Sequence, residues 1–136
     1  MKYKYSICHP DKEEIENKDN ILTTDEVKQI ADSYSWGSEL VKMEGLEQPC
    51  YNPSLDFKNI ETNYSLGLTA HKKENKIMFS IWFGRPVIKK SFLGLFGEKV
   101  VVEAIDKWEY EKKEALEFLD IFLEMDYEKL EEKMND

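Results

Sequence analysis

Two cysteines and two histidines are the side chains of this chain best suited to act as nucleophiles or metal ligands. Cys50 lies in the proline-flanked segment 49–53, and with His71 it could form the thiol–imidazole pair that cysteine nucleophiles use. Nothing else around Cys50 matches a nucleophile setting, so a thiol packed as a small apolar group is the simpler interpretation. Cys8 and His9 are adjacent in a predicted strand and would point to opposite faces, which disfavours chelation of one metal by both. We therefore predict no catalytic residue, no metal site and no cofactor.

Charge is distributed unevenly along the chain. Residues 11–32 contain eight acids and three lysines, a net charge of −5, and residues 111–136 contain ten acids and four lysines, a net charge of −6. Residues 72–100 contain seven bases and two acids, a net charge of +5. The whole chain has a net charge of −9 and a single arginine, which argues against direct binding to nucleic acid or to anionic membranes. The net negative charge favours binding to a basic partner, and solubility alone would also explain it.

Length and composition predict one domain over 1–136. Hydrophobic residues make up 41% of the 136 residues, which is enough for one core. No apolar run has the length of a signal peptide or of a membrane span, so we expect a soluble, cytoplasmic protein.

Period-two alternation of apolar and polar residues predicts an antiparallel sheet. Residues 2–8 alternate and read as a strand near an edge, because they contain lysines. The runs 64–70 and 77–83 alternate on either side of a short polar turn, which is typical of a hairpin. Further strands are expected over 55–60, 87–88 and 99–105, with a turn over 92–97.

Helix signals occur near both ends of the chain. Thr23 and Glu26 fit a capping box that opens a helix over 24–34. A broad apolar stripe predicts a long helix over 109–125, and Asp126 could cap a last helix over 127–134. The predicted class is α+β: an antiparallel sheet of four to six strands packed by an N-terminal helix and a long C-terminal helix.

Large aromatic side chains beside acids are the best candidates for recognition of a partner, because aromatic anchors dominate many protein interfaces. The segment that begins at Trp36 could be helical or part of an irregular strand, and residues 47–54 are predicted to form a loop. Loops often carry recognition. Core packing is the alternative for each tryptophan, including Trp82, which lies on the strand face opposite the apolar core positions. The predicted partner-binding residues are Trp36, Glu39, Glu44 and Glu47, with Trp108 and Glu109 as a second choice.

Three stretches of the chain carry a resemblance to a known family: Ser35-Trp36-Gly37-Ser38-Glu39-Leu40, the segment 63–68 at the start of the hairpin, and the segment 117–123 in the C-terminal helix. With these stretches the chain resembles the small acidic immunity proteins of bacterial polymorphic-toxin and contact-dependent inhibition systems. The resemblance implies a cytosolic α+β domain without catalytic residues that binds one cognate toxin domain, often a nuclease. An acidic inhibitor would meet a basic nuclease surface with fast, electrostatically steered association.

The predicted function is therefore neutralisation of a cognate, basic toxin domain by occlusion of its active site. Two alternatives stay open from the residues alone. One is a small enzyme with a site built from Cys50, His71 and carboxylates. The other is a structural or oligomerising module, such as a homodimer, in which the basic segment 72–100 pairs with the acidic segments of another copy. The same charges could instead pair within one chain.

Overall fold

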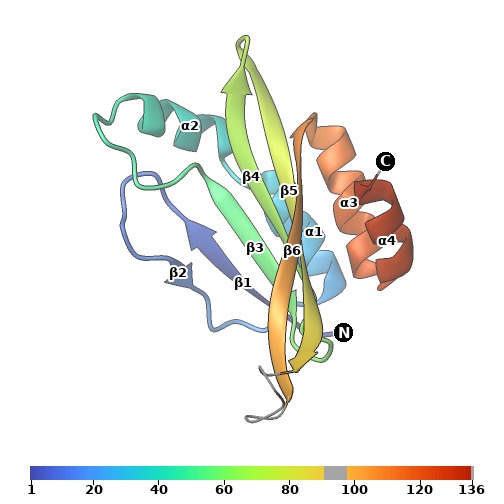
Figure 1. Ribbon diagram of the computed structural model, residues 1–136. Helices are drawn as coiled ribbons and strands as arrows, with labels where there is room; N and C mark the ends of the chain where they lie inside the picture. The colour runs from blue at the N-terminus through green and yellow to red at the C-terminus, as the bar shows by residue number, and fades with distance from the viewer. Residues whose placement is uncertain (91–97, 136) are drawn as a thin grey trace.

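The computed structural model of this chain describes residues 1–90 and 98–135 and, within them, all side chains except those of 88–90 and 98–101. The described residues form an α+β domain with one six-stranded antiparallel sheet and four helices, which confirms the predicted class (Figure 1). The strands are β1 (Tyr3–Cys8), β2 (Glu16–Asn17), β3 (Ser54–Asn59), β4 (Ser65–Lys73), β5 (Lys76–Lys90) and β6 (Glu98–Tyr110). The helices are α1 (Thr24–Ser33), α2 (Trp36–Glu44), α3 (Lys112–Leu123) and α4 (Tyr127–Met134).

The strand order is β2-β1-β3-β4-β5-β6, so the predicted hairpin of β4 and β5 lies near the middle of the sheet. The alternation of apolar and polar residues along the strands gives the sheet two different faces. One register row places Tyr5, Phe57, Leu66, Phe83 and Ile105 side by side on the inner face. The predicted strands 77–83 and 87–88 belong to one strand, and β1 is separated from the sheet edge by the two-residue β2. The turn predicted over 92–97 lies outside the described residues.

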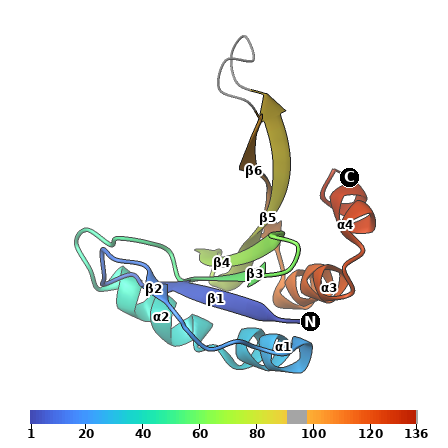
Figure 2. The ribbon, with the colours of Figure 1, turned by 90° about the horizontal axis from the view of Figure 1, so that it is seen from below.

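The helices lie on the inner face of the sheet. Buried side chains of α1, α2, α3 and α4 join those of β1, β3, β4 and β5 in one apolar cluster. Figure 2 shows α1 and α2 on one side of β1, β3 and β4, and it shows α3 and α4 beyond the hairpin of β5 and β6. The angle between β1, β3 and β4 and this hairpin holds no described helix. The hairpin of β5 and β6 rises away from the other strands in the same view. We call the helix-free side the outer face.

Local capping explains where the helices begin. The Thr23 hydroxyl accepts a hydrogen bond from the Glu26 N–H, and the Glu26 carboxylate accepts one from the Thr23 N–H, as the capping box predicts. Asp126 caps α4 through the Lys129 N–H at 3.2 Å. The segment that begins at Trp36, for which the sequence left helix and irregular strand open, contains α2, and α2 follows α1 after a short break.

The long C-terminal helix predicted over 109–125 is wrong in length, because α3 has 12 residues. Tyr110 still belongs to β6, where it pairs with Phe79. Glu111 then caps α3 through a capping box with Glu114. At the other end, Met125 has a left-handed backbone conformation, with φ of 60°, which separates α3 from α4.

A substitution at Gly84 should destabilise the central strands. Gly84 lies on the outer face opposite Ser65 of β4 and Ala104 of β6. An added Cβ would collide with the Ser65 Oγ and lie 3.2 Å from the Val102 Cγ1. We expect Gly84→Ala to lower the free energy of unfolding by about 1–3 kcal/mol, the usual range for overpacking. Urea denaturation measures this loss. The variant Gly84→Ala with Ser65→Ala should recover part of it, and failure to recover would assign the cost to something other than this collision.

Candidate protein-binding surface

An exposed group of aromatic rings lies on the outer face across β4, β5 and β6. The Trp82 and Trp108 rings meet edge to face, with centroids 6.1 Å apart at 73°, and the His71 ring lies 5.8 Å from that of Trp108. Trp108 is 55% exposed and Trp82 is 38% exposed. We call His71, Trp82 and Trp108 the aromatic cluster. Large aromatic side chains that remain exposed in contact with one another are typical of surfaces that bind a partner.

A β-bulge positions Trp108 within this cluster. Ile81 pairs with Lys107 and Phe79 with Tyr110, so Trp108 and Glu109 together oppose the single residue Ser80. The Glu109 backbone has φ of 70°, which lies in the left-handed region that non-glycine residues seldom adopt. Bulges of this kind re-aim side chains at the edge of a sheet.

Hydrogen bonds and an ion pair hold the cluster in place. The Trp108 Nε1 donates to the Asp106 Oδ2 at 2.9 Å, and the Trp82 Nε1 donates to the Ser80 Oγ at 3.2 Å. Both indole donors are therefore satisfied, which leaves the ring surfaces for apolar contact. The Lys73 Nζ lies 2.8 Å from the Glu109 Oε1, and this lysine holds the pKa of the Glu109 carboxyl below its usual value, first by hydrogen bonding and then by its charge.

Glu44 and Glu109, which are far apart in sequence, flank the same hairpin. Lys72 and Lys73 are neighbours at the end of β4. The Lys72 Nζ lies 3.0 Å from the Glu44 Oε1, and Lys73 pairs with Glu109. The structure thus brings the end of α2 and the β6 bulge to one end of the sheet.

Glu47 lies in the loop between α2 and β3, and Figure 1 shows this loop beside the acidic loop that follows β1. The Cys50 N–H donates to the Pro10 carbonyl at 2.8 Å, and the Tyr51 hydroxyl donates to the Glu13 carbonyl at 2.9 Å, so the two loops are bonded side by side. We call the exposed acids of these loops the acidic loop edge, which comprises Asp11, Glu13, Glu14 and Glu47. Within the described part of the chain none of the four forms an ion pair, so their charges are available to a basic partner.

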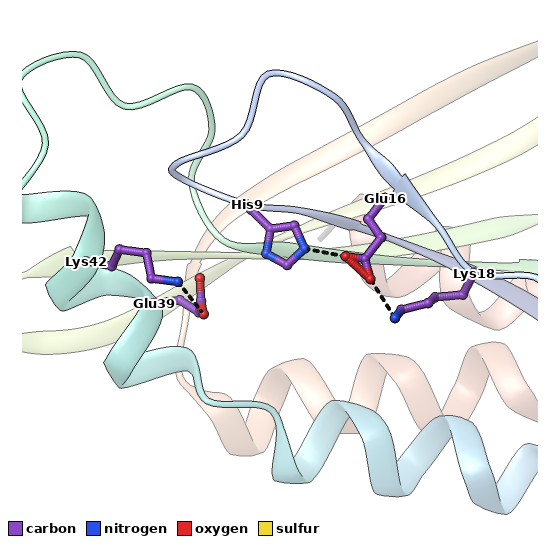
Figure 3. Close-up of polar contacts among 5 residues, drawn as sticks. All are labelled: His9, Glu16, Lys18, Glu39 and Lys42. Atoms are coloured by element: carbon purple, nitrogen blue, oxygen red, sulfur yellow. Dashed lines mark hydrogen bonds and ion pairs between the residues drawn. The ribbon is translucent and has the colours of Figure 1, made fainter.

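Glu39 is oriented beneath the sheet and away from the outer face. Figure 3 shows its carboxylate beside the chain of polar contacts formed by His9, Glu16 and Lys18. The Glu39 side chain is 17% exposed, and its Oε1 lies 3.4 Å from the Lys42 Nζ. The His9 Nε2 and the Glu16 Oε2 are 3.0 Å apart. Burial, followed by the charge of Glu39, raises the pKa of Tyr34 to about 12.

Trp36 is a core residue, in contrast to its prediction as a contact for a partner. It is 4% exposed, and its ring meets that of Phe79 edge to face at a centroid distance of 5.0 Å. The indole Nε1 donates to the Ala31 carbonyl at 3.1 Å, which joins the start of α2 to the end of α1. The physical reason is that 36–44 is an amphipathic helix whose buried residues are Trp36 and Leu40.

The enzyme alternative requires Cys50 and His71 to form one site, and the structure places them in different surroundings. Cys50 is exposed in the loop before β3, and His71 belongs to the aromatic cluster. No hydrogen bond joins the two among the described residues. In that same part of the chain, no group of three or more His, Cys, Asp or Glu side chains is placed to hold a metal ion.

A polar hollow of about 390 Å³ on the outer face was not foreseen from the sequence. Lys4 of β1 and Lys58 of β3 are directly opposite one another there, beside Asp56. Burial raises the pKa of the Asp56 carboxyl, and the charge of Lys58 opposes this shift. Alternation along each strand places these residues on the polar face, but their meeting depends on the register of β1 against β3.

Trp82 was not among the partner-binding residues predicted from the sequence, although it belongs to the aromatic cluster. Its place on the outward side of its strand follows from the alternation, whereas its contact with Trp108 follows from the pairing of β5 with β6.

In comparisons with known proteins, the chain matches no family model, no curated protein and no solved structure. None of the described helices has both the length and the apolar character needed to span a membrane.

Proposed function

We propose that this chain is a non-catalytic protein-binding domain that neutralises a cognate toxin domain, as an immunity protein does. The observation that carries this proposal is the pair of exposed tryptophans in edge-to-face contact on a sheet face that no described helix covers. An indole that is exposed in the free protein and held by its own hydrogen bond is a preorganised anchor for a partner. Binding at this surface needs no catalytic group.

The charge of the chain supports a basic partner. The acidic loop edge lies at the β1 side of the sheet and the aromatic cluster at the β6 side. Four strand spacings separate β1 from β6, a path of about 19 Å measured along the sheet, and one standard protein interface spans this distance. A basic domain bound across the outer face would meet aromatic anchors at one side and the carboxylates of the acidic loop edge at the other.

The mechanism we propose is occlusion. The toxin domain, for which a nuclease is the leading candidate, would present its basic active-site cleft to this face and be blocked from its substrate. The acids would accelerate association, because charge complementarity mainly raises the association rate. The site of action would be the cytoplasm of a bacterial cell, where the chain would meet the toxin.

Capture and rescue together test the proposed function. Tagged protein is mixed with the lysate and secreted fraction of the source cells at low and moderate salt, and captured proteins are identified by mass spectrometry. We expect one basic domain in near-equal amount, and co-expression of this chain should abolish the toxicity of that domain. Failure to capture such a domain, or toxicity that persists in spite of binding, would contradict the proposal.

Alanine at Trp108 should weaken binding of the captured domain by about 30-fold or more, the effect of losing a hot-spot anchor. The matched control is Val41→Ala, which removes a side chain that is 62% exposed on α2, away from the aromatic cluster. Isothermal titration calorimetry of both variants gives the comparison. Equal affinities for Trp108→Ala and Val41→Ala would exclude the aromatic cluster from the interface.

The contribution of the acidic loop edge can be measured in the same way. The triple variant Glu13→Lys, Glu14→Lys and Glu47→Lys is compared with Glu117→Lys, Asp120→Lys and Glu124→Lys, which make the same charge change on and just after α3. The loop variant should lower the association rate more than the α3 variant does. An equal decrease would assign the effect to net charge alone.

A further inference from the structure

β6 is the last strand of the sheet, and among the described residues β5 is its only partner strand. An edge strand of 13 residues presents a row of backbone donors and acceptors that can pair with another chain. Val102, Ala104, Asp106 and Trp108 are all exposed along this strand. Natural proteins usually protect such an edge or use it to pair with another strand.

The sequence of β6 is complementary to itself in the antiparallel direction. When Ile105 is placed opposite Ile105 of a second copy, Glu103 faces Lys107 and Lys107 faces Glu103. The same register places Val102, 60% exposed, opposite Trp108, 55% exposed. Pairing with β5 fixes the faces: Glu103 and Lys107 lie on the inner side, opposite Arg85 and Ile81, whereas Val102 and Trp108 lie on the outer side. Opposite charges and apolar groups at facing positions are the pairs that stabilise a sheet.

Neighbouring symmetric registers lose this match. With Ala104 at the centre, Val102 faces Asp106 and Glu103 faces Ile105. With Asp106 at the centre, Lys107 faces Ile105 and Trp108 faces Ala104. Of these three centres, Ile105 is the one that pairs Glu103 with Lys107 and Val102 with Trp108. Asp106 faces Ala104 in this register and keeps its hydrogen bond from the Trp108 Nε1 of its own chain, and the bulge at Trp108 and Glu109 marks where regular pairing would stop.

We propose that two copies of this chain form a homodimer by antiparallel pairing of their β6 strands about Ile105. The interface is isologous, because each contact occurs twice around a two-fold axis. The two sheets become one continuous sheet, the outer faces lie on the same side, and the two aromatic clusters become neighbours. This inference does not depend on the proposed function, since it concerns self-association alone.

Sedimentation equilibrium of the full chain tests the dimer over about 5 μM to 1 mM, the range suited to a small interface. We expect a monomer–dimer equilibrium. Lys107→Glu places two acids opposite each other twice per dimer and should raise the dimer Kd by about tenfold or more. The matched control is Lys113→Glu, the same charge change at an exposed position of α3, and it should have a smaller effect.

A charge swap distinguishes direct pairing from a general effect of charge. Glu103→Lys combined with Lys107→Glu restores opposite charges across the interface and should return the dimer Kd toward that of the wild type. Arg85 lies 3.9 Å from Glu103 but also 2.6 Å from Glu131, so it keeps one acidic partner in this variant. Circular dichroism verifies the fold of every variant.

Amide hydrogen exchange of the wild type supplies an independent readout that needs no variant. Protection of the amides in 102–107 should rise with protein concentration, while that of α1 stays constant. A monomer throughout the concentration range would overturn the proposal. So would equal effects of Lys107→Glu and Lys113→Glu, or protection of 102–107 that does not change with concentration.

Discussion

Alanine at Trp36 should lower the free energy of unfolding by about 3–5 kcal/mol, the range observed for removal of a large aromatic side chain from a core. The indole ring fills the space between α2 and β5, where it contacts Phe79 at a centroid distance of 5.0 Å and Tyr34 at 4.6 Å. The substitution also leaves the Ala31 carbonyl without the indole donor that now reaches it at 3.1 Å. Urea denaturation followed by far-UV circular dichroism measures the loss, which is a large share of the stability of a typical domain.

Trp108→Ala is the matched comparison for Trp36→Ala. Trp108 is 55% exposed, and its indole hydrogen bond goes to a carboxylate that water can also solvate. We expect its removal to change the free energy of unfolding by less than about 1 kcal/mol, as for most surface substitutions. Equal losses for the two variants would contradict the assignment of Trp36 to the core and of Trp108 to the surface.

Alanine at Tyr127 should destabilise the domain by about 3 kcal/mol and loosen α4 first. The Tyr127 ring stacks on that of Tyr64 at a centroid distance of 3.9 Å and an interplanar angle of 9°, and it lies 6.0 Å from the ring of Phe122. Its hydroxyl accepts from the Asn59 Nδ2 at 3.2 Å and lies 3.0 Å from the Thr62 Oγ1. One side chain at the start of α4 thus connects this helix to β3, to α3 and to the turn before β4.

Tyr127→Phe separates the hydroxyl from the ring. Asn59 is fully buried, and its side-chain amide would lose the oxygen that it now reaches. We expect a loss of about 1–3 kcal/mol, the cost of a buried donor without a partner. In Tyr127→Ala, amide hydrogen exchange should become faster in α4 than in α1. In Tyr127→Phe, the exchange rates of α4 should change little. Uniform exposure of both helices in Tyr127→Ala would show that α4 does not open separately.

Several elements could be predicted because their signals are local. Alternation over 64–70 and 77–83 specified the central hairpin, since a strand places successive side chains on opposite faces. The start of α1 followed from Thr23 and Glu26, whose side chains satisfy each other's backbone N–H groups within one turn. Asp126 marked α4 for a similar reason.

The end of β6 could not be predicted, although it decides the proposed site. Residues 109–111 fit a helix pattern, but Tyr110 pairs with Phe79 some thirty residues earlier in the chain, and a bulge at Trp108 and Glu109 accommodates the register. Strand pairing at that separation overrides a local preference, because tertiary contacts outweigh propensity differences of a few tenths of a kcal/mol per residue.

The candidate site, like the fold, was determined partly by the sequence and partly by the tertiary structure. The sequence by itself determined an acidic α+β chain, the two faces of its central strands, and the residue types suited to recognition. Only the tertiary structure decided that Trp36 is buried against Phe79, that Trp108 stays exposed beside Trp82, and that the loop before β3 is bonded to the acidic loop after β1. The physical reason is that backbone periodicity and caps depend on residues a few positions apart. The exposure of a side chain depends instead on which distant element packs against it.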